Sequence, residues 1–315
     1  MPQTLSTSKE QVSAEKKAVA HPGLVRTYIA LMKPKIIFLL LITTWGAMLV
    51  AAGGRVGFWT FFWTTVGGIL AAGGANAINH YLDRDIDALM YRTKRRPIPA
   101  GWVKSSHAIT FGVVLNILAF AVLVTQINLL AAVLAMLGTL YYVFVYTIWL
   151  KRRTHHNVTI GGVAGAIPVL VGWAAVTGGL SLTAWLLFLI VFLWTPPHTW
   201  ALTLVVKRDY ARVDVPMLPV SVGEDEARRQ IWIYSWIFYA STLLPTLLHS
   251  MGWFYFGVTL VTGAIFMRGA YRVYRQGEKK DAFSLYKFSL LHLALLFGAM
   301  VVDTILVARY PFMIW

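Results

Sequence analysis

The 315-residue sequence contains no cysteine, which excludes disulfide bonds, thiolate metal sites and cysteine nucleophiles. Charged residues are also scarce, at 13% of the chain against about one quarter in a typical soluble domain. Hydrophobic residues make up 58% of the chain, and its mean hydropathy is +0.64. These values predict an integral membrane protein.

Acidic residues are the rarer charged class, with 13 Asp and Glu against 28 Lys and Arg and a formal net charge of +15. A basic chain can bind nucleic acid, but the basic residues here lie in several short loops between apolar segments. This distribution is typical of membrane topology signals and of contacts with anionic lipid headgroups. We therefore expect a lipid bilayer, and no nucleic acid, as the surroundings of this protein.

The first 23 residues lack the apolar core of a signal peptide, and we expect them to form a disordered cytoplasmic tail. Residues 24–315 are expected to form a single polytopic domain with nine transmembrane helices. The expected spans are 36–52, 58–80, 107–125, 128–150, 158–177, 183–206, 230–248, 252–271 and 288–308. With nine spans, all of the Lys and Arg residues except Arg55 and Arg309 lie on one side. The N-terminus is therefore predicted to be cytoplasmic and the C-terminus external.

An acidic and basic segment, "NHYLDRDIDALMYRTKRRPIPAG" (79–101), directly follows the second predicted span. Asn79, Asp83 and Asp87 are spaced at i, i+4 and i+8, so on a continuing helix they line one face. An amide and two carboxylates are good ligands for a hard cation, and Mg²⁺ prefers carboxylates together with water and phosphate oxygens. The pattern suggests a Mg²⁺-bridged diphosphate, with nearby Arg side chains as direct partners.

A second charged segment, residues 205–230, follows the sixth predicted span on the same side of the membrane and contains Lys207, Asp209 and Asp214. The two segments look like two halves of one site that face each other across a cavity. Taken alone, each segment is also explained by charges that cap a helix and solvate a loop. Glycine and alanine clusters at 67–77 and 161–168 are expected to allow close helix approach.

Four motifs, in this order, resemble those of the intramembrane UbiA-type prenyltransferases, most closely the protoheme IX farnesyltransferases (heme O synthases). They are "NHYLDRDIDALMYRTKRRPIPAG", "KRRTHHNVTIGGVAGAIPVLVGWAA" (151–175), "WTPPHTWAL" (194–202) and "KRDYARVDVPMLPV" (207–220). The resemblance covers residues 24–308 and implies an all-α UbiA-type bundle around a central cavity. One departure is that Asp209 and Asp214 are five residues apart instead of four, so we expect Asp209 with Lys207 to act and not Asp214.

The resemblance implies an enzyme that transfers the farnesyl group of farnesyl diphosphate to a vinyl group of heme b, with addition of water, to give heme O. It implies Mg²⁺ as the cofactor and heme b as a substrate. The implied catalytic residues are Asp83, Asp87 and Asp209, and the implied metal ligands are Asn79, Asp83, Asp87 and Asp209. The implied substrate-binding residues are Asn79, Arg92, Arg96, Lys207, Tyr210, Asn157 and His198. The aromatic side chains nominated to shield an allylic cation are Tyr141, Tyr142, Tyr146 and Trp194.

Several alternatives remain open. His198 is an ionisable group inside a predicted span, and it either contacts heme or is a structural hydrogen-bonded histidine. The acceptor is otherwise an aromatic acid, as in quinone biosynthesis, or a chlorophyllide. A cation-coupled transporter is a remote alternative, since its charges should lie near the bilayer midplane and not at one surface. The resemblance further implies a multi-pass protein of the inner cell membrane with its active-site loops in the cytoplasm, and heme A synthase or terminal oxidase assembly as partners.

Overall fold

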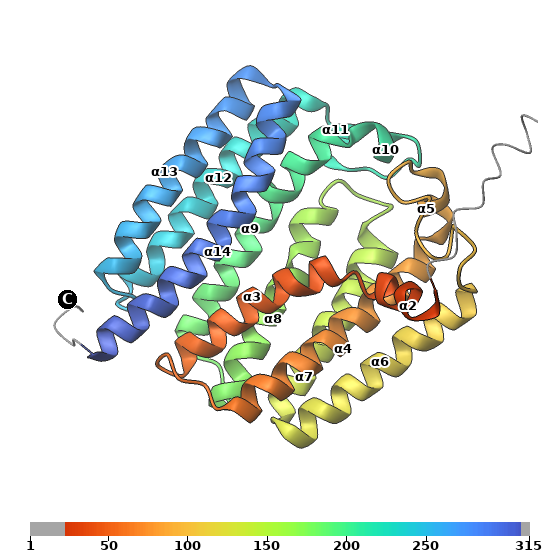
Figure 1. The fold of residues 1–315 in the computed structure, drawn as a ribbon. Helices are drawn as coiled ribbons and strands as arrows, with labels where there is room; N and C mark the ends of the chain where they lie inside the picture. Colours follow the sequence, from red (N-terminus) through yellow and green to blue (C-terminus); the bar gives the residue numbers. More distant parts are fainter. Residues whose placement is uncertain (1–22, 310–315) are drawn as a thin grey trace, which may run out of the picture.

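The computed structural model describes residues 23–309, and this part of the chain folds into a bundle of helices without strands (Figure 1). The predicted all-α class is therefore confirmed. The predicted N-terminal tail lies outside the described residues, except for Gly23. The long helices are α3 (Pro34–Ala51), α4 (Phe58–Leu82), α6 (Ser105–Gln126), α7 (Leu129–Leu140) with its continuation η1 (Tyr141–Leu150), α8 (Asn157–Thr177), α9 (Leu182–Val205), α12 (Glu224–Leu247), α13 (Trp253–Gln276) and α14 (Lys279–Arg309).

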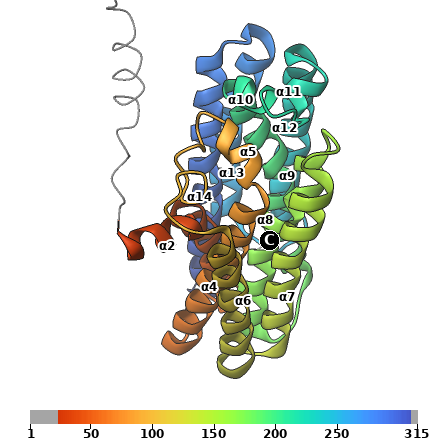
Figure 2. The same ribbon diagram turned by 90° about the vertical axis from the view of Figure 1, so that its right-hand side faces the viewer.

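Four short helices complete the described part: α2 (Leu24–Met32), α5 (Arg84–Leu89), α10 (Lys207–Ala211) and α11 (Leu218–Ser221). Figures 1 and 2 show α5, α10 and α11 together at one end of the bundle, while α2 lies at its side and packs against α4. The residues between α2 and α3 turn sharply, because Lys33 has a left-handed backbone (φ 58°) and Pro34 starts the next helix. The two charged segments of the sequence thus fold at the same end.

Seven helices of the described part, with α7 and η1 counted as one, are long and apolar enough to cross a membrane. The other two long helices, α12 and α13, have 24 residues each. Their hydropathy is lowered by charged ends, with three acidic residues in the first turn of α12 and three arginines in the last turns of α13. The structure is that of a multi-pass membrane protein.

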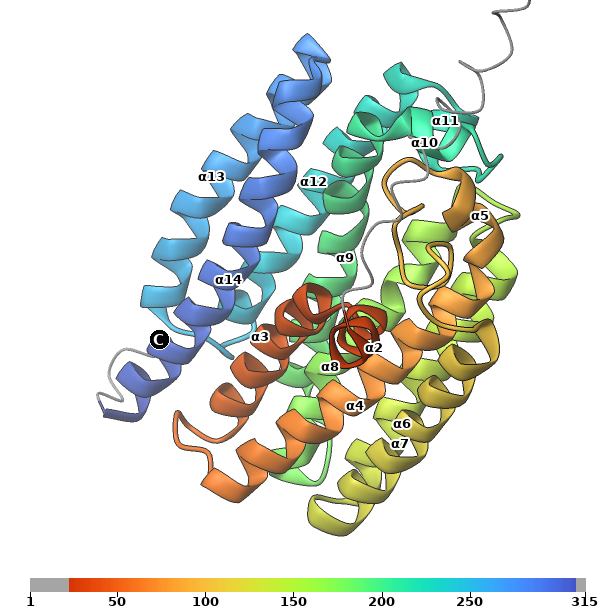
Figure 3. The ribbon, with the colours of Figure 1, turned by 45° about the vertical axis from the view of Figure 1, so that its right-hand side comes forward.

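The helices α8 and α9 lie at the centre of the bundle. Helix α8 packs against α3, α7, η1 and α9, while α9 also packs against α12 and α14. Figure 3 shows the α12–α13–α14 group on one side of this centre and α4, α6 and α7 on the other. The apolar contacts of the largest core cluster connect α3, α8, α9 and the α12–α14 group.

One charged residue inside a long helix has a structural explanation. Asp303 of α14 is buried, and its two carboxylate oxygens accept hydrogen bonds from the backbone amides of Gly252 (2.6 Å) and Tyr255 (3.0 Å). These amides belong to the first turn of α13 and have no acceptor within that helix. Asp303 therefore caps the N-terminus of α13, and its negative charge interacts favourably with the positive end of the helix dipole.

Glycines allow α4 and α6 to approach closely, as expected for the 67–77 cluster. A Cβ atom on Gly74 would lie 2.6 Å from the carbonyl oxygen of Gly112, and one on Gly112 would lie 2.8 Å from that of Gly74. Both distances are shorter than van der Waals contact. A larger residue at either position must push two helix backbones apart.

We expect Gly74→Ala to lower the melting temperature of the purified protein, since overpacking a close helix contact costs about 1–3 kcal/mol. Gly298→Ala is the matched control, because nothing lies within 4 Å of a Cβ atom there. Alanine is also the better helix former by about 1 kcal/mol, so the control should be neutral or stabilising. Thermal unfolding in detergent measures both, and equal melting temperatures for the two variants would contradict the proposed packing.

Candidate active site

Three of the predicted site residues, Asn79, Asp83 and Asp87, lie on one face although their helix is interrupted. Helix α4 ends at Leu82, and Asp83 departs from helical geometry (φ −92°, ψ 5°) before α5 begins. The amide of Asp83 still donates to the carbonyl of Asn79 (2.9 Å), and that of Asp87 donates to the carbonyl of Asp83 (2.8 Å). These two bonds preserve the spacing of a continuous helix. All three residues are buried.

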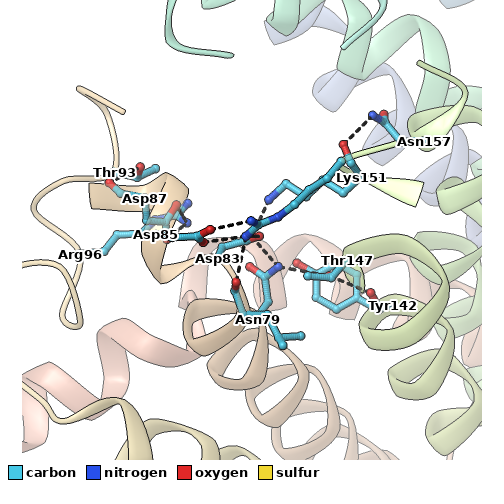
Figure 4. A network of polar contacts seen from close by, with 12 residues as sticks. Asn79, Asp83, Asp85, Asp87, Thr93, Arg96, Tyr142, Thr147, Lys151 and Asn157 are labelled. Carbon is cyan, nitrogen blue, oxygen red and sulfur yellow. Dashed lines mark hydrogen bonds and ion pairs between the residues drawn. The ribbon is translucent and has the colours of Figure 1, made fainter. Parts of the chain in front are cut away.

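A network of hydrogen bonds and ion pairs, made by basic, amide and hydroxyl side chains, surrounds Asp83 (Figure 4). The ammonium group of Lys151 lies 2.5 Å from Asp83 Oδ2, and the amide of Asn79 donates to the same oxygen at 2.8 Å. The amide of Asn79 also donates to the Thr147 hydroxyl, while Asn79 Oδ1 accepts from Lys33 Nζ at 2.7 Å. Segments far apart in the sequence therefore meet at one buried carboxylate.

The neighbouring carboxylates have separate partners. One terminal nitrogen of Arg96, Nη1, lies 2.9 and 2.7 Å from the two oxygens of Asp87, and Thr93 donates to the Asp87 carbonyl at 2.9 Å. Asp85 faces away, with a side chain that is 60% exposed, and pairs with Arg152. The hydrogen bonds from Arg152 lower the pKa of Asp85 to about 2. Asp85 and Arg152 thus form an ion pair that faces solvent. The two buried carboxylates are those of Asp83 and Asp87.

The buried cluster contains more cations than carboxylates. Lys33, Lys151 and Arg96 bond to a group that includes only Asp83 and Asp87 as anions. Burial, together with the positive charges of Arg96 and Lys151, lowers the pKa of Lys33 to about 7. Such crowding of like charges in a partly dry site favours the binding of an additional anion.

The end of the fourth predicted span is a π-helix, η1, and this geometry delivers Lys151 to the site. The Thr147 hydroxyl donates to the carbonyl of Tyr142, and the amide of Lys151 donates to the carbonyl of Tyr146, five residues back. In an α-helix, Tyr142 and Lys151 would lie about 180° apart. The wider turn brings them nearer to one face, as π-helices often do at functional sites.

The second charged segment contacts the first at one end of the bundle. Asp209 Oδ2 in α10 accepts a hydrogen bond from the backbone amide of Arg92 at 3.3 Å. Asn157 is fully buried and donates weakly to the carbonyls of Lys151 (3.3 Å) and Pro216 (3.5 Å). Through these bonds, the loop after η1, the loop after α9 and the loop after α5 form one rim.

Lys207 and Asp214 of the second segment point away from the buried carboxylates. Lys207 pairs with Glu224 at the start of α12 (3.1 Å), in a partly exposed ion pair. Asp214 is exposed and has a left-handed backbone (φ 50°), so it lies off the face of Asp209. The side chain of Arg92 is exposed, and Tyr210 is half-buried against the main core cluster.

A largely apolar cavity of about 380 Å³ lies between α3, α4, α7, η1, α8 and α9. Its polar lining includes Asn76, one turn before Asn79, together with Tyr142 and Tyr146, whose rings stack at 5.6 Å. Glycines of the 161–168 cluster also line it, and a Cβ on Gly165 would meet open space. Part of that cluster therefore shapes the cavity in addition to packing helices.

Two of the nominated aromatic residues and His198 lie outside this lining. Tyr141 donates to the Ile160 carbonyl, and Trp194 donates to the carbonyl of Ser289 in α14. His198 Nδ1 lies 2.6 Å from the Ser289 hydroxyl, while its ring stacks on Trp194. The neighbouring Thr195 and Thr199 line the cavity instead. His198 thus faces α14, and its contact with heme stays a prediction.

The oxygens of the cluster match Mg²⁺ in kind, because carboxylate and amide oxygens are hard ligands. Asp83 Oδ1 is buried and has no hydrogen-bond partner within the described residues, with only Arg152 at 3.8 Å. Over residues 23–309, no group of three or more His, Cys, Asp or Glu side chains is arranged to hold a metal. Lys151 and Arg96 contact the carboxylates where a metal would bind.

Two residues of this site, Lys33 and Lys151, were given no site role from the sequence, although Lys151 opens the 151–175 motif. Lys33 is separated from its partner Asn79 by 46 positions, and Lys151 from Asp83 by 68. The available signal was position, since both lysines stand beside the ends of apolar spans on the side of the acidic segment.

Comparisons with known proteins identify the family of this chain. Residues 39–296 match the model of the UbiA prenyltransferase family. The chain is 52% identical over 287 residues to a protoheme IX farnesyltransferase of Roseiflexus sp. (strain RS-1), covering 91% of this chain and 54% of that protein. It is 47% identical to that of Gloeobacter violaceus, covering 93% and 96%. The chain spans about half the length of the first of these relatives and nearly all of the second.

Solved structures show the same fold. A digeranylgeranylglyceryl phosphate synthase aligns with a TM-score of 0.74 at 20% identity, over 89% of this chain and 98% of that one. A UbiA homolog from Archaeoglobus fulgidus, bound to DMAPP and Mg²⁺, aligns with a TM-score of 0.66 at 14% identity, over 88% and 99%. On this combined basis the chain belongs to the UbiA prenyltransferase family, in the branch of the protoheme IX farnesyltransferases.

Proposed function

We propose that this protein transfers the farnesyl group of farnesyl diphosphate to a vinyl group of heme b and, with addition of water, forms heme O and diphosphate. One observation carries the proposal: a buried, cation-rich carboxylate cluster stands beside a largely apolar cavity. Such a site suits a substrate with a highly charged diphosphate and a hydrocarbon chain. The names of the relatives, one of which matches over almost its whole length, support heme b as the acceptor.

The first chemical requirement is loss of diphosphate from the allylic carbon. The C–O bond breaks heterolytically, and the bonding pair leaves with the diphosphate oxygen. Lys33, Lys151 and Arg96 are placed to bind that anion, because three basic groups surround only two carboxylates, and a bound anion would favour the charged form of Lys33. Arg92 and Lys207, at the rim, are further proposed contacts.

We propose Asn79, Asp83, Asp87 and Asp209 as the residues that hold Mg²⁺. When bound, the metal would supply Lewis-acid neutralisation of the diphosphate oxygens. Two of these side chains also orient the lysines, since the Asp83 carboxylate fixes Lys151 and the Asn79 amide oxygen fixes Lys33. The Mg²⁺ in the Archaeoglobus fulgidus homolog supports this proposal, with DMAPP as the prenyl diphosphate there.

The second requirement is to keep water away from the allylic cation until the acceptor reacts. The terminal vinyl carbon of heme b supplies the electron pair for the new C–C bond, leaving a cation on the adjacent carbon. Water then adds to that carbon and releases one proton, so atoms and charges balance. The stacked Tyr142 and Tyr146 rings line the cavity and present π-faces to a cation.

The remaining proposals concern the membrane. We propose that α12 and α13 also cross it, giving nine transmembrane helices in one domain over residues 24–315. Because almost all basic residues of the loops then share one side, the active-site loops and the N-terminus are proposed to be cytoplasmic. In bacteria this places the protein in the inner membrane. Heme A synthase or terminal oxidase assembly is the proposed destination of the product.

The carboxylates can be tested one at a time. We expect Asp83→Asn and Asp87→Asn to lower turnover about 100-fold or more, because each removes a proposed Mg²⁺ ligand and the carboxylate that holds Lys151 or Arg96 in place. Asp85→Asn and Asp214→Asn should retain most activity, since both side chains are exposed.

Chelation of Mg²⁺ should abolish turnover of the unaltered protein. Adding Mg²⁺ back should restore the turnover.

These variants are to be assayed for heme O formation, with thermal unfolding as the check on folding. Asp83→Asn and Asp87→Asn variants that fold and keep most of their activity would contradict the assignment of the diphosphate site.

The acceptor can be tested by mass spectrometry of the products. Purified protein incubated with heme b, farnesyl diphosphate and Mg²⁺ should yield heme carrying one farnesyl group and one hydroxyl. In H₂¹⁸O the hydroxyl should contain the heavy oxygen, because water captures the second cation. Prenylation of 4-hydroxybenzoate or a chlorophyllide, with heme b unchanged, would assign the protein to another acceptor class.

A further inference from the structure

A second hollow, of about 310 Å³, lies between the end of α13 and the start of α14. It shares no lining residue with the apolar cavity described above. Helix α13 is at the outer edge of the bundle, and it ends toward the same end of the bundle as α10 and α11 (Figure 1). The polar side chains of its lining are Arg268, Arg272, Asp281 and Ser284.

The two arginines of this hollow lack an acidic partner. Arg268 and Arg272 are four residues apart on α13 and therefore lie on one face. Within residues 23–309, no carboxylate oxygen lies within 4.0 Å of either guanidinium group. By contrast, Arg228 and Arg229 nearby each have an acidic partner three residues away. The hollow thus offers two guanidinium groups to an anion from outside the chain.

Asp281 adds a requirement for a hydrogen-bond donor. Its Oδ2 atom is buried and has no hydrogen-bond partner in the part of the chain that the structure describes. A buried acceptor without a donor is costly, so a ligand that supplies an N–H or O–H group would be favoured. The same carboxylate would repel a simple anion such as inorganic phosphate. The hollow therefore suits a ligand with both an anionic group and a donor.

The surface next to the arginines is apolar. Ile265, which lines the hollow, is 50% exposed, and Val261, one turn earlier on the same face, is 63% exposed. Residues 261, 265, 268 and 272 thus form a stripe that is apolar inside the span and cationic at its end. This order matches the hydrocarbon and headgroup regions of one bilayer leaflet.

We propose that the hollow binds one glycerophospholipid whose headgroup carries a hydrogen-bond donor. Its phosphodiester lies between Arg268 and Arg272, the ammonium of ethanolamine or a hydroxyl of glycerol donates to Asp281, and an acyl chain lies along Ile265 and Val261. Phosphatidylcholine has the same phosphodiester but no donor, so it should bind poorly. The site is independent of the proposed prenyl transfer.

The test uses the full-length protein reconstituted into vesicles of phosphatidylethanolamine, phosphatidylglycerol and phosphatidylcholine in equal amounts, and native mass spectrometry of the lipid retained after extraction. We expect one retained phosphatidylethanolamine or phosphatidylglycerol per chain, at least tenfold more often than phosphatidylcholine. Vesicles with only one donor lipid beside phosphatidylcholine show which headgroup is preferred. Equal retention of phosphatidylcholine by the unaltered protein overturns the proposal without any variant.

Variants locate the site. Arg268→Gln with Arg272→Gln should lose the retained lipid, whereas Arg275→Gln, which removes the same charge from the same helix outside the hollow, should keep it. Asp281→Asn should retain lipid but lose the preference over phosphatidylcholine. Loss of lipid in the Arg275 variant to the same extent, or unchanged lipid in the double variant, overturns the proposal. Displacement of the lipid by millimolar inorganic phosphate would instead assign a free-anion site and also overturn it.

Discussion

The ion pair between Asp83 and Lys151 is the interaction on which the rest of the site depends. An ionised carboxylate that is fully buried costs several kcal/mol unless a cation and hydrogen bonds compensate it. Here the compensation comes from Lys151 and Asn79, and Asn79 is itself held by Lys33. The start of the first long helix, the end of the second and the end of the fourth are thereby fixed to one another.

This constraint links the fold to the proposed chemistry. A site that must ionise an allylic diphosphate needs concentrated positive charge, yet cations alone would repel one another in a partly dry bundle end. Asp83 and Asp87 hold those cations in place without neutralising all of them. The neighbouring cavity, lined by glycine, alanine and aromatic residues, supplies the apolar space beside this charge. The charged cluster thus suits the diphosphate group of the proposed substrate, and the cavity suits its hydrocarbon chain.

The sequence alone predicted the helical class, the shared face of Asn79, Asp83 and Asp87, and the placement of the two charged segments at one end of the bundle, because each follows from local periodicity or from helix order. It did not predict the contacts of Lys33 and Lys151, which connect segments that are distant along the chain. Nor did periodicity show that His198 faces α14 while Thr195 and Thr199 face the cavity. A helix that is apolar on every side gives no sign of which side faces a cavity.

The π-helix η1 makes the reach of Lys151 dependent on the type of helix that precedes it. A π-turn holds one residue more than an α-turn, so each residue of η1 turns the chain by less than the roughly 100° of an α-helix. If the same residues returned to ordinary α geometry, everything after the segment would rotate about the helix axis. Lys151 would then swing away from Asp83, although no side chain of the pair had changed. A substitution between Tyr141 and Leu150 that stabilises α geometry would therefore alter the site from a distance.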